Sequence, residues 1–279
     1  MKEVNGWHLM DGEEDPGYKW WSKERENWQN GWIKFALQHT RGQRRTAIDI
    51  GAAYGSTSRI FAKRFEKVEA FEINTGEQQK CYYLNMEPYR NYVLHNKGLW
   101  SKETEVAYEH YKWSGKNRIS QSATLPGRYG DIDDFKKFEN KPVYTLDSFN
   151  FQNVDLIKID VEGAEGHVLW GARETIDKWR PNIIVEVQGL QNGMRYNESL
   201  ERYGEPQQIV SKKNGRPLAS NFGWWGAAAC HKCYEVYYFM NMMDYVCVDT
   251  HANDLLYVHK EKFDEWEGKQ ATSIQPHHL

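Results

Sequence analysis

The sequence has few cysteines, and they are poorly placed for a disulfide framework. The four of them, Cys81, Cys230, Cys233 and Cys247, are scattered over 279 positions. Cys230 and Cys233 form a C-x-x-C pair, but a structural zinc site needs about four ligands and the sequence has no second pair of this kind. We therefore predict no metal site at these cysteines. The fold is expected to depend on its hydrophobic core, for which 40% hydrophobic residues suffice.

Long apolar runs and a surplus of one charge are also absent. Residues 234–248 come closest to an apolar run, but Glu235, Asn241 and Asp244 interrupt it, so we expect no membrane span. The first residues, MKEVNGWHLMDGEEDPG, contain no apolar segment of the kind found in signal peptides, and we expect a soluble, cytoplasmic protein. The formal net charge of −3 provides no broad basic surface, which argues against nucleic acid or an anionic membrane as partner.

Short apolar segments alternate with helical segments along most of the chain. The expected strands cover residues 46–50, 67–71, 92–95, 155–159 and 182–187, and apolar runs at 245–248 and 255–258 predict a closing hairpin. Helices are expected over residues 20–39, 56–64 and 164–179, and a core helix is expected around residues 237–243. A further helix is expected to begin after Asn74, which can cap it together with Glu77. This order predicts an α/β fold: a mostly parallel seven-stranded sheet with helices on both faces and a C-terminal antiparallel hairpin.

This pattern divides the chain into three regions. Residues 1–45 consist of an N-terminal arm, which we expect to be irregular over residues 1–18, followed by the first helix. Residues 46–265 form the main domain, and residues 266–279 form a tail. Insertions near 101–141 and 189–230 follow the carboxyl ends of expected strands, where open α/β sheets bind ligands. We expect these insertions to be walls or lids of a substrate cleft. Both contain aromatic side chains: Tyr108, Tyr111 and Trp113 in the first, and Phe222, Trp224 and Trp225 in the second.

The turn after the first expected strand is a candidate cofactor site. Gly51 and Gly55 lie four residues apart and let a ligand approach the backbone. A site for a dinucleotide would have a second glycine where Ala53 stands. Asp49 would repel a phosphate, but it would attract the ammonium of an amino acid such as the methionyl part of S-adenosylmethionine.

An acid at the end of the second expected strand completes this site. Glu72 is placed to accept hydrogen bonds from both hydroxyls of a ribose, although such an acid serves many nucleosides. We predict S-adenosylmethionine as cofactor. The predicted cofactor-binding residues in these two segments are Asp49, Gly51, Ala52, Ala53, Tyr54, Gly55, Ser56, Glu72 and Ile73.

Residues 155–170, DLIKIDVEGAEGHVLW, form the other informative segment. A V-L-x-G-A helix at 168–172 and a P-x-I-x-x-E strand at 181–186 follow it, and the step LDSF at 146–149 precedes it. In this order, over roughly residues 46–187, the chain resembles the FkbM family of S-adenosylmethionine-dependent methyltransferases. The resemblance implies a Rossmann-like class I methyltransferase fold and O-methylation. The two insertions depart from the family pattern, so the resemblance leaves the acceptor open.

The same segment contains candidate catalytic groups. The strand at 155–159 lies beside the strand at 46–50 in this topology, so we expect Asp160 and Glu162 beside the cofactor, with Asp160 contacting it. A hydroxyl acceptor must lose a proton, and Asp160, Glu162 and Glu165 are candidates for the base or for a metal ligand. Alternatively, Asp160 only caps the helix start, and Glu162 and Glu165 only stabilise the helix N-terminus through its dipole. Glu186 is expected to orient the acceptor. Lys158, inside an apolar strand, is either a catalytic lysine or the ion-pair partner of Asp160 or Glu186.

Three functions remain open at this point. The leading prediction is O-methylation of a small-molecule or carbohydrate acceptor (a sugar, a glycan or a natural product), because pyranose faces stack on Trp and Tyr. The second is ribose 2′-O-methylation of nucleic acid, which Lys158, Asp160 and Glu186 weakly favour and the net charge of −3 opposes. The third is a cofactor-binding module without catalysis. The sequence does not indicate an oligomeric state.

Overall fold

A mostly parallel sheet forms the centre of the protein. The structure, a computed structural model, describes residues 1–10, 33, 36–37, 43–111, 117–119, 135–161, 163–186, 231–251 and 254–262. Within these residues the sheet has seven strands in the order β12-β13-β11-β10-β3-β4-β5. The strands are β3 (Thr46–Ile50), β4 (Lys67–Phe71), β5 (Tyr92–His95), β10 (Val154–Ile159), β11 (Asn182–Glu186), β12 (Tyr245–His251) and β13 (Asp254–His259).

The strand directions confirm the predicted fold class. The five strands from β5 to β11 run parallel, whereas β13 is antiparallel to both β11 and β12, which makes the expected C-terminal hairpin. The central strands are buried on both faces, so they are short continuous apolar runs and their positions can be predicted well. The carboxyl ends of β3, β4, β10 and β11 and the start of β13 therefore meet at one edge of the sheet.

Helices cover both faces of the sheet. Phe61 of α2 (Ser56–Ala62) and Tyr82 of α3 (Glu77–Met86) pack into one cluster with Leu156 of β10. On the other face α4 (Glu165–Gly171), α5 (Arg173–Trp179) and α8 (His231–Met242) pack on Ile157 and Ile159. Alternate residues of β10 thus point to opposite faces, as the strand periodicity requires. No helix within the described parts of the chain has the length and apolarity needed to cross a membrane.

Two predicted helix features are wrong. The single helix expected over 164–179 is α4 followed by α5, because the carboxylate of Asp147 accepts the backbone N–H groups of Glu174 (3.0 Å) and Thr175 (2.8 Å) and so caps a new helix start. Asn74 does not cap α3, which follows Gly76 without a side-chain cap. The amide of Asn74 instead donates a hydrogen bond to Gln78.

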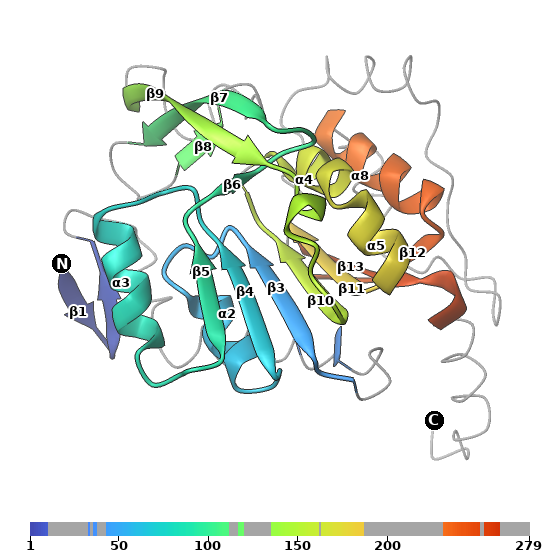
Figure 1. Cartoon of the computed structure of the whole chain (residues 1–279), viewed down its shortest axis with the longest axis horizontal. Helices are drawn as coiled ribbons and strands as arrows, with labels where there is room; N and C mark the ends of the chain where they lie inside the picture. The colour runs from blue at the N-terminus through green and yellow to red at the C-terminus, as the bar shows by residue number, and fades with distance from the viewer. Residues whose placement is uncertain are drawn as a thin grey trace, which may run out of the picture.

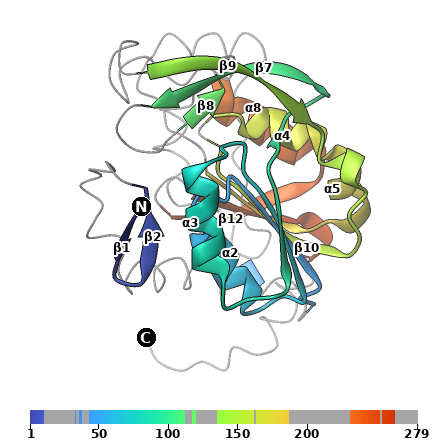
Figure 2. The same cartoon turned by 60° about the vertical axis from the view of Figure 1, so that its left-hand side comes forward.

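A smaller sheet packs on the carboxyl edge of the large one. Among the described residues it has four strands in the order β6-β9-β7-β8, which are β6 (Gly98–Leu99), β7 (Thr104–Tyr111), β8 (Asn117–Ile119) and β9 (Phe135–Tyr144). Val106 and Val143 of this sheet pack with Ile73 and Val161, which follow the carboxyl ends of β4 and β10. Figures 1 and 2 show β7 and β9 lying across the end of the large sheet. The described part of the first insertion therefore lies at the predicted edge.

The first ten residues contain a β-hairpin, so the prediction of an irregular segment is wrong there. Strands β1 (Lys2–Val4) and β2 (Trp7–Leu9) pair antiparallel around Asn5 and Gly6, which both have positive φ. Asn-Gly is a preferred sequence for such a two-residue turn. The hairpin lies beside α3 in Figures 1 and 2.

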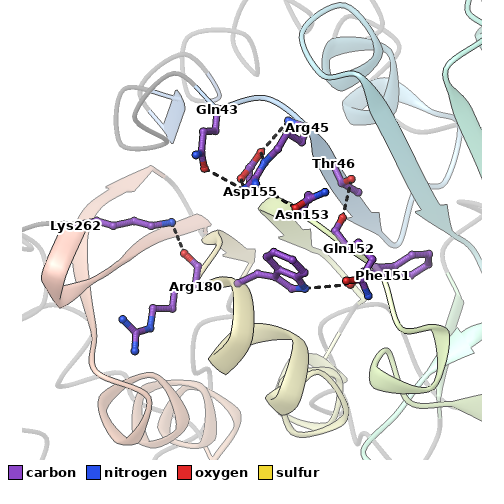
Figure 3. Close-up of polar contacts among 10 residues, drawn as sticks. Gln43, Arg45, Thr46, Phe151, Gln152, Asn153, Asp155, Arg180 and Lys262 are labelled. Carbon is purple, nitrogen blue, oxygen red and sulfur yellow. Dashed lines mark hydrogen bonds and ion pairs between the residues drawn. The ribbon is translucent and has the colours of Figure 1, made fainter.

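An ion pair at the amino edge of the sheet holds β3 against β10. The guanidinium of Arg45, just before β3, donates to both carboxylate oxygens of Asp155, at 3.1 and 2.5 Å, and its backbone N–H donates to Oδ2 at 2.8 Å (Figure 3). Asp155 is buried, and this contact raises the pKa of Arg45. The contact lies at the opposite end of the strands from the candidate site, so it concerns stability.

Candidate active site

The turn after β3 has an unusual backbone that the sequence motif makes possible. Gly51, Ala53 and Gly55 all have positive φ, of 85°, 47° and 86°. A Cβ on Gly51 would lie 1.8 Å from the backbone oxygen of Asp160, and one on Gly55 would lie 3.2 Å from the ring of Tyr82. Glycine at 51 is therefore required by contact with the loop after β10 as well as by backbone conformation.

Hydrogen bonds hold this turn against β4. The backbone N–H groups of Gly51 and Ala52 both donate to the carbonyl of Phe71 at 3.0 Å, and that of Gly55 donates to the carbonyl of Ala52 at 2.8 Å. Helix α2 begins at Ser56, directly after the turn. The structure thus brings the predicted cofactor residues of 51–56 together in one compact segment at the carboxyl edge.

Glu72 connects the turn to the loop after β4. One carboxylate oxygen accepts the backbone N–H of Ala53 at 2.9 Å, and the other accepts that of Asn74 at 2.8 Å. Burial raises the pKa of Glu72, although these backbone donors and the charge of Lys141 act in the opposite direction. Next to it, the backbone oxygen of Ile73 accepts a hydrogen bond from Lys141 of β9 at 3.1 Å. Each carboxylate oxygen has a further lone pair, so contact with a ribose remains a prediction.

Asp49 lies beneath the turn and not on its surface. It is 1% exposed, and its Oδ2 accepts a hydrogen bond from the hydroxyl of Ser58 on α2 at 2.5 Å. Burial raises its pKa to about 6, although Ser58 and the charge of Lys158 oppose this shift. This position favours a role in holding α2 to β3. The direct contact with a cofactor ammonium that the sequence suggests remains a prediction.

Lys158 forms ion pairs with acids from two strands. Its ammonium lies 3.3 Å from Oδ2 of Asp160 and 3.1 Å from Oδ1 of Asp254, the first residue of β13. Burial alone would lower the pKa of Lys158, but the charges of Asp160, Asp254 and Glu186 outweigh it and raise the pKa above its ordinary value. Lys158 is thus a buried cation, as the ion-pair interpretation of the sequence predicts.

Asp254 is a site residue that the sequence analysis missed. It pairs in register with Glu186, the last residue of β11. Because β13 is antiparallel to β11, its first residue lies at the carboxyl edge. A lysine buried in an apolar strand signals that acids must lie nearby, but only the strand register identifies which acid.

The other predicted catalytic acids have different surroundings. Glu165 is buried, and its Oε1 accepts the backbone N–H groups of Val161 at 3.3 Å and Gly163 at 2.9 Å, so it shapes the loop before α4. Glu165 also lies in the first turn of α4, which fits the helix-dipole interpretation of this acid. Glu162 lies outside the described residues. Asp160 follows β10 directly and its side chain is 41% exposed, which leaves it accessible at the carboxyl edge.

The aromatic residues of the first insertion do not form the expected stacking surface where they are described. Tyr108 is fully buried within the small sheet, so it cannot stack on an acceptor. Trp100, just before that insertion, is also buried and stacks on His167 with ring centroids 3.6 Å apart. Trp113, the second insertion at 189–230 and Cys230 lie outside the described residues. The side chains of Tyr111 and Cys233 are also not described.

One family model matches the chain. It is described as the methyltransferase FkbM domain and covers residues 49–211, more than half of the sequence. This range begins at Asp49 and includes the turn, Glu72 and the segment from Lys158 to Glu186. No curated protein matches the chain.

A comparison with solved structures finds several that are similar to this chain. The methyltransferase FkbM of Methylobacillus flagellatus KT is 15% identical, with a TM-score of 0.43 over 78% of this chain and 44% of that one. Magnesium protoporphyrin IX methyltransferase of Synechocystis PCC 6803, with bound S-adenosylmethionine, is 11% identical, with a TM-score of 0.42 over 90% and 86%. The chain thus spans less than half the length of the Methylobacillus protein.

The domain match and the strand order together confirm the predicted family, fold class and cofactor. They also confirm the enzyme class of the domain, whereas they do not identify an acceptor. This chain belongs to the FkbM methyltransferase family of S-adenosylmethionine-dependent enzymes.

Proposed function

We propose that the protein methylates a hydroxyl oxygen of a sugar, a glycan or another small natural product. One observation carries this proposal: Asp160 touches the cofactor turn through its backbone and still has an accessible carboxylate. A Cβ added to Gly51 would lie 1.8 Å from the backbone oxygen of Asp160, whereas the side chain of Asp160 is 41% exposed. A carboxylate therefore lies next to the turn that we assign to the methyl donor.

The surrounding residues fit S-adenosylmethionine. Residues 51–56 of the turn include no lysine or arginine to pair with a phosphate, and the carboxylate of Glu72 at the side of the turn has the chemistry to accept hydrogen bonds from vicinal hydroxyls. S-adenosylmethionine supplies a methyl group on a sulfonium, so that a C–O bond forms as the C–S bond breaks. What the chain must add is alignment of the acceptor and removal of its proton.

We assign the removal of this proton to Asp160. The hydroxyl proton of the acceptor passes to a carboxylate oxygen of Asp160, and the products are the methyl ether and S-adenosylhomocysteine. Lys158 is not suited to accept it, because the neighbouring acids raise its pKa and keep it protonated. The ammonium of Lys158, 3.3 Å from Oδ2, instead orients the Asp160 side chain.

The charge of the cluster supports a neutral acceptor over a nucleic acid. One lysine faces Asp160 and Asp254 in direct ion pairs and Glu186 at longer range. Among the described residues of this cluster the acids thus outnumber the cation, and their charge would repel a phosphate backbone. We also propose a cytoplasmic location, which the small number of cysteines supports.

The test has two steps. Calorimetry should first show that the wild-type protein binds S-adenosylhomocysteine. Turnover of S-adenosylmethionine should then be measured with panels of sugars, glycans, small phenols and alcohols, nucleosides and short RNAs. We expect an O-methylated sugar or small-molecule product, and Asp160→Asn should lower kcat about 100-fold with little change in cofactor affinity.

Three outcomes would contradict the proposal. Salt-dependent turnover of RNA oligomers would identify a nucleic-acid enzyme. Binding of S-adenosylhomocysteine without turnover of any acceptor would favour a non-catalytic module. An equal loss of turnover and cofactor affinity in Asp160→Asn would assign Asp160 to binding and not to proton removal.

A further inference from the structure

The N-terminal hairpin, residues 2–9, packs directly against the turn that we assign to the cofactor. Trp7 and Leu9 of β2 are buried in one cluster with Tyr54 of the turn and Cys81 of α3. The guanidinium of Arg59 on α2 lies 4.4 Å from the centroid of the Trp7 ring. This hairpin precedes residue 49, so it lies outside the segment that matches the FkbM domain.

A two-stranded hairpin of this size is not stable by itself. Each strand has three residues, and an isolated hairpin is at best marginally stable in water. Its order must therefore come from burial of Trp7 and Leu9 against the turn and α3. Anything that alters the turn changes the surface on which the hairpin is packed.

The side chain of Asn85 connects the hairpin to the turn. Its Oδ1 accepts the backbone N–H of His8 at 2.8 Å, and its Nδ2 donates to the backbone oxygens of His8 at 3.0 Å and Tyr54 at 2.9 Å. Asn85 is buried on α3, so each of these bonds is costly to lose. The carboxamide thus pairs with His8 as a neighbouring strand would, while holding the carbonyl of Tyr54.

The turn needs such support because its backbone is strained. Ala53 has a φ of 47°, which few residues other than glycine adopt. Strained conformations persist only where the surroundings hold them. The carboxylate of Glu72 holds Ala53 by accepting the backbone N–H of Ala53. Asn85 holds Tyr54 by donating to the backbone oxygen of Tyr54, and the hairpin packs on the same residue.

We propose that Asn85 and the N-terminal hairpin position the cofactor turn, so that packing of the hairpin and binding of S-adenosylmethionine favour each other. Asn85 is a positioning residue, because it acts through the backbone of Tyr54. The proposal rests on the assignment of the turn to the cofactor, and it is independent of the acceptor and of catalysis. Linkage requires the effect to be reciprocal: the factor by which the packed hairpin strengthens cofactor binding is the factor by which the cofactor stabilises hairpin packing.

Two variants test this coupling from opposite sides. Trp7→Ala weakens hairpin packing without changing the turn or α3, and Asn85→Leu removes the three hydrogen bonds while keeping four side-chain heavy atoms branched at Cγ. We expect the Kd for S-adenosylhomocysteine, measured by calorimetry, to rise about tenfold in each, within the range of ordinary coupling between sites. Glu3→Ala, on the exposed side of the hairpin, should leave the Kd unchanged.

A second control separates coupling from general loss of stability. Ile176→Ala removes a buried side chain of α5 on the opposite face of the sheet and should lower the melting temperature without raising the Kd. Hydrogen exchange on the unaltered protein gives an independent readout if a variant fails to fold. Saturating S-adenosylhomocysteine should slow exchange of the amides of residues 2–9 by a factor similar to the rise in Kd.

The proposal is overturned if Trp7→Ala and Asn85→Leu bind S-adenosylhomocysteine as tightly as the wild-type protein. It is equally overturned if the ligand is bound but exchange in the hairpin does not change. If these results support coupling while no acceptor is methylated, the O-methylation proposal fails and this inference stands.

Discussion

The hydroxyl of Ser58 donates a 2.5 Å hydrogen bond to Asp49 inside the protein, between α2 and β3. Asp49 is 1% exposed, and burial raises its pKa from 3.8 to about 6. A buried carboxyl with a raised pKa stabilises the folded state when it is protonated. That contribution is complete below the pKa of the unfolded chain and is lost as the pH rises through about 6.

We therefore predict that replacing Asp49 changes how stability depends on pH. Asp49→Asn removes the cost of ionising a buried carboxyl, so its free energy of unfolding relative to wild type should increase by up to about 3 kcal/mol between pH 4 and pH 7. Urea unfolding of both proteins at a series of pH values measures this difference. Ser58→Ala keeps Asp49 but removes the hydrogen bond that favours its ionised form. In this variant the loss of stability caused by ionisation of Asp49 should therefore occur at a higher pH than in the wild-type protein. A difference that stays constant with pH would contradict the raised pKa.

Glu72 allows a sharper test of the cofactor site. In Glu72→Gln, an amide nitrogen replaces one of the two oxygens that accept the backbone N–H groups of Ala53 and Asn74. We expect the Kd for S-adenosylhomocysteine to rise about tenfold or more, the effect of losing one charged hydrogen bond and its partner. Calorimetry gives the Kd, and Glu87→Gln at the exposed end of α3 is the matched control. Equal affinities of the two variants would remove Glu72 from the binding site.

The large sheet could be predicted from the sequence because its strands are buried on both faces. Segments such as Thr46–Ile50 and Val154–Ile159 are then short apolar runs, and they differ from their predicted bounds by at most one residue. The N-terminal hairpin lacks this signal, since only Trp7 and Leu9 of β2 are buried. The small sheet is not predicted for another reason. The apolar residues Val106 and Tyr108 are two positions apart, as in a strand, but they lie in a segment that the sequence pattern marks as an insertion.

The candidate site was predictable in part for a similar reason. Gly51, Gly55 and Glu72 belong to continuous segments at strand ends, so position along the chain locates them. The partner Asp254 lies far from Lys158 in sequence, and the antiparallel register of β13 brings the two together. The burial of Asp49 beneath the turn also depends on the packing of α2, which sequence spacing does not define.

From the Arg45–Asp155 pair we predict that the burial of an ion pair, and not the distance between its atoms, determines how much the pair contributes to the free energy of unfolding. Asp155→Asn should lower the free energy of unfolding by about 2 kcal/mol, because an amide nitrogen replaces one of the two oxygens that accept from the Arg45 guanidinium and the buried negative charge is lost. The pair of Arg180 and Glu261 has the same 2.5 Å contact but is largely exposed. Glu261→Gln should therefore cost about 0.5 kcal/mol or less. Urea unfolding compares the two, and similar losses would contradict this argument.

The close approach of Gly51 to Asp160 predicts that glycine is needed there for more than its backbone freedom. Gly51 and Gly76 have nearly equal φ, 85° and 84°, but a Cβ on Gly76 meets nothing within 4 Å. Both alanine variants should lose about 1–3 kcal/mol of stability from backbone strain. Only Gly51→Ala should also push the loops after β3 and β10 apart, and we expect it to raise the Kd for S-adenosylhomocysteine about 100-fold or to abolish binding. Calorimetry on both variants checks this. If Gly76→Ala weakened binding as much as Gly51→Ala, backbone strain alone would explain the glycine.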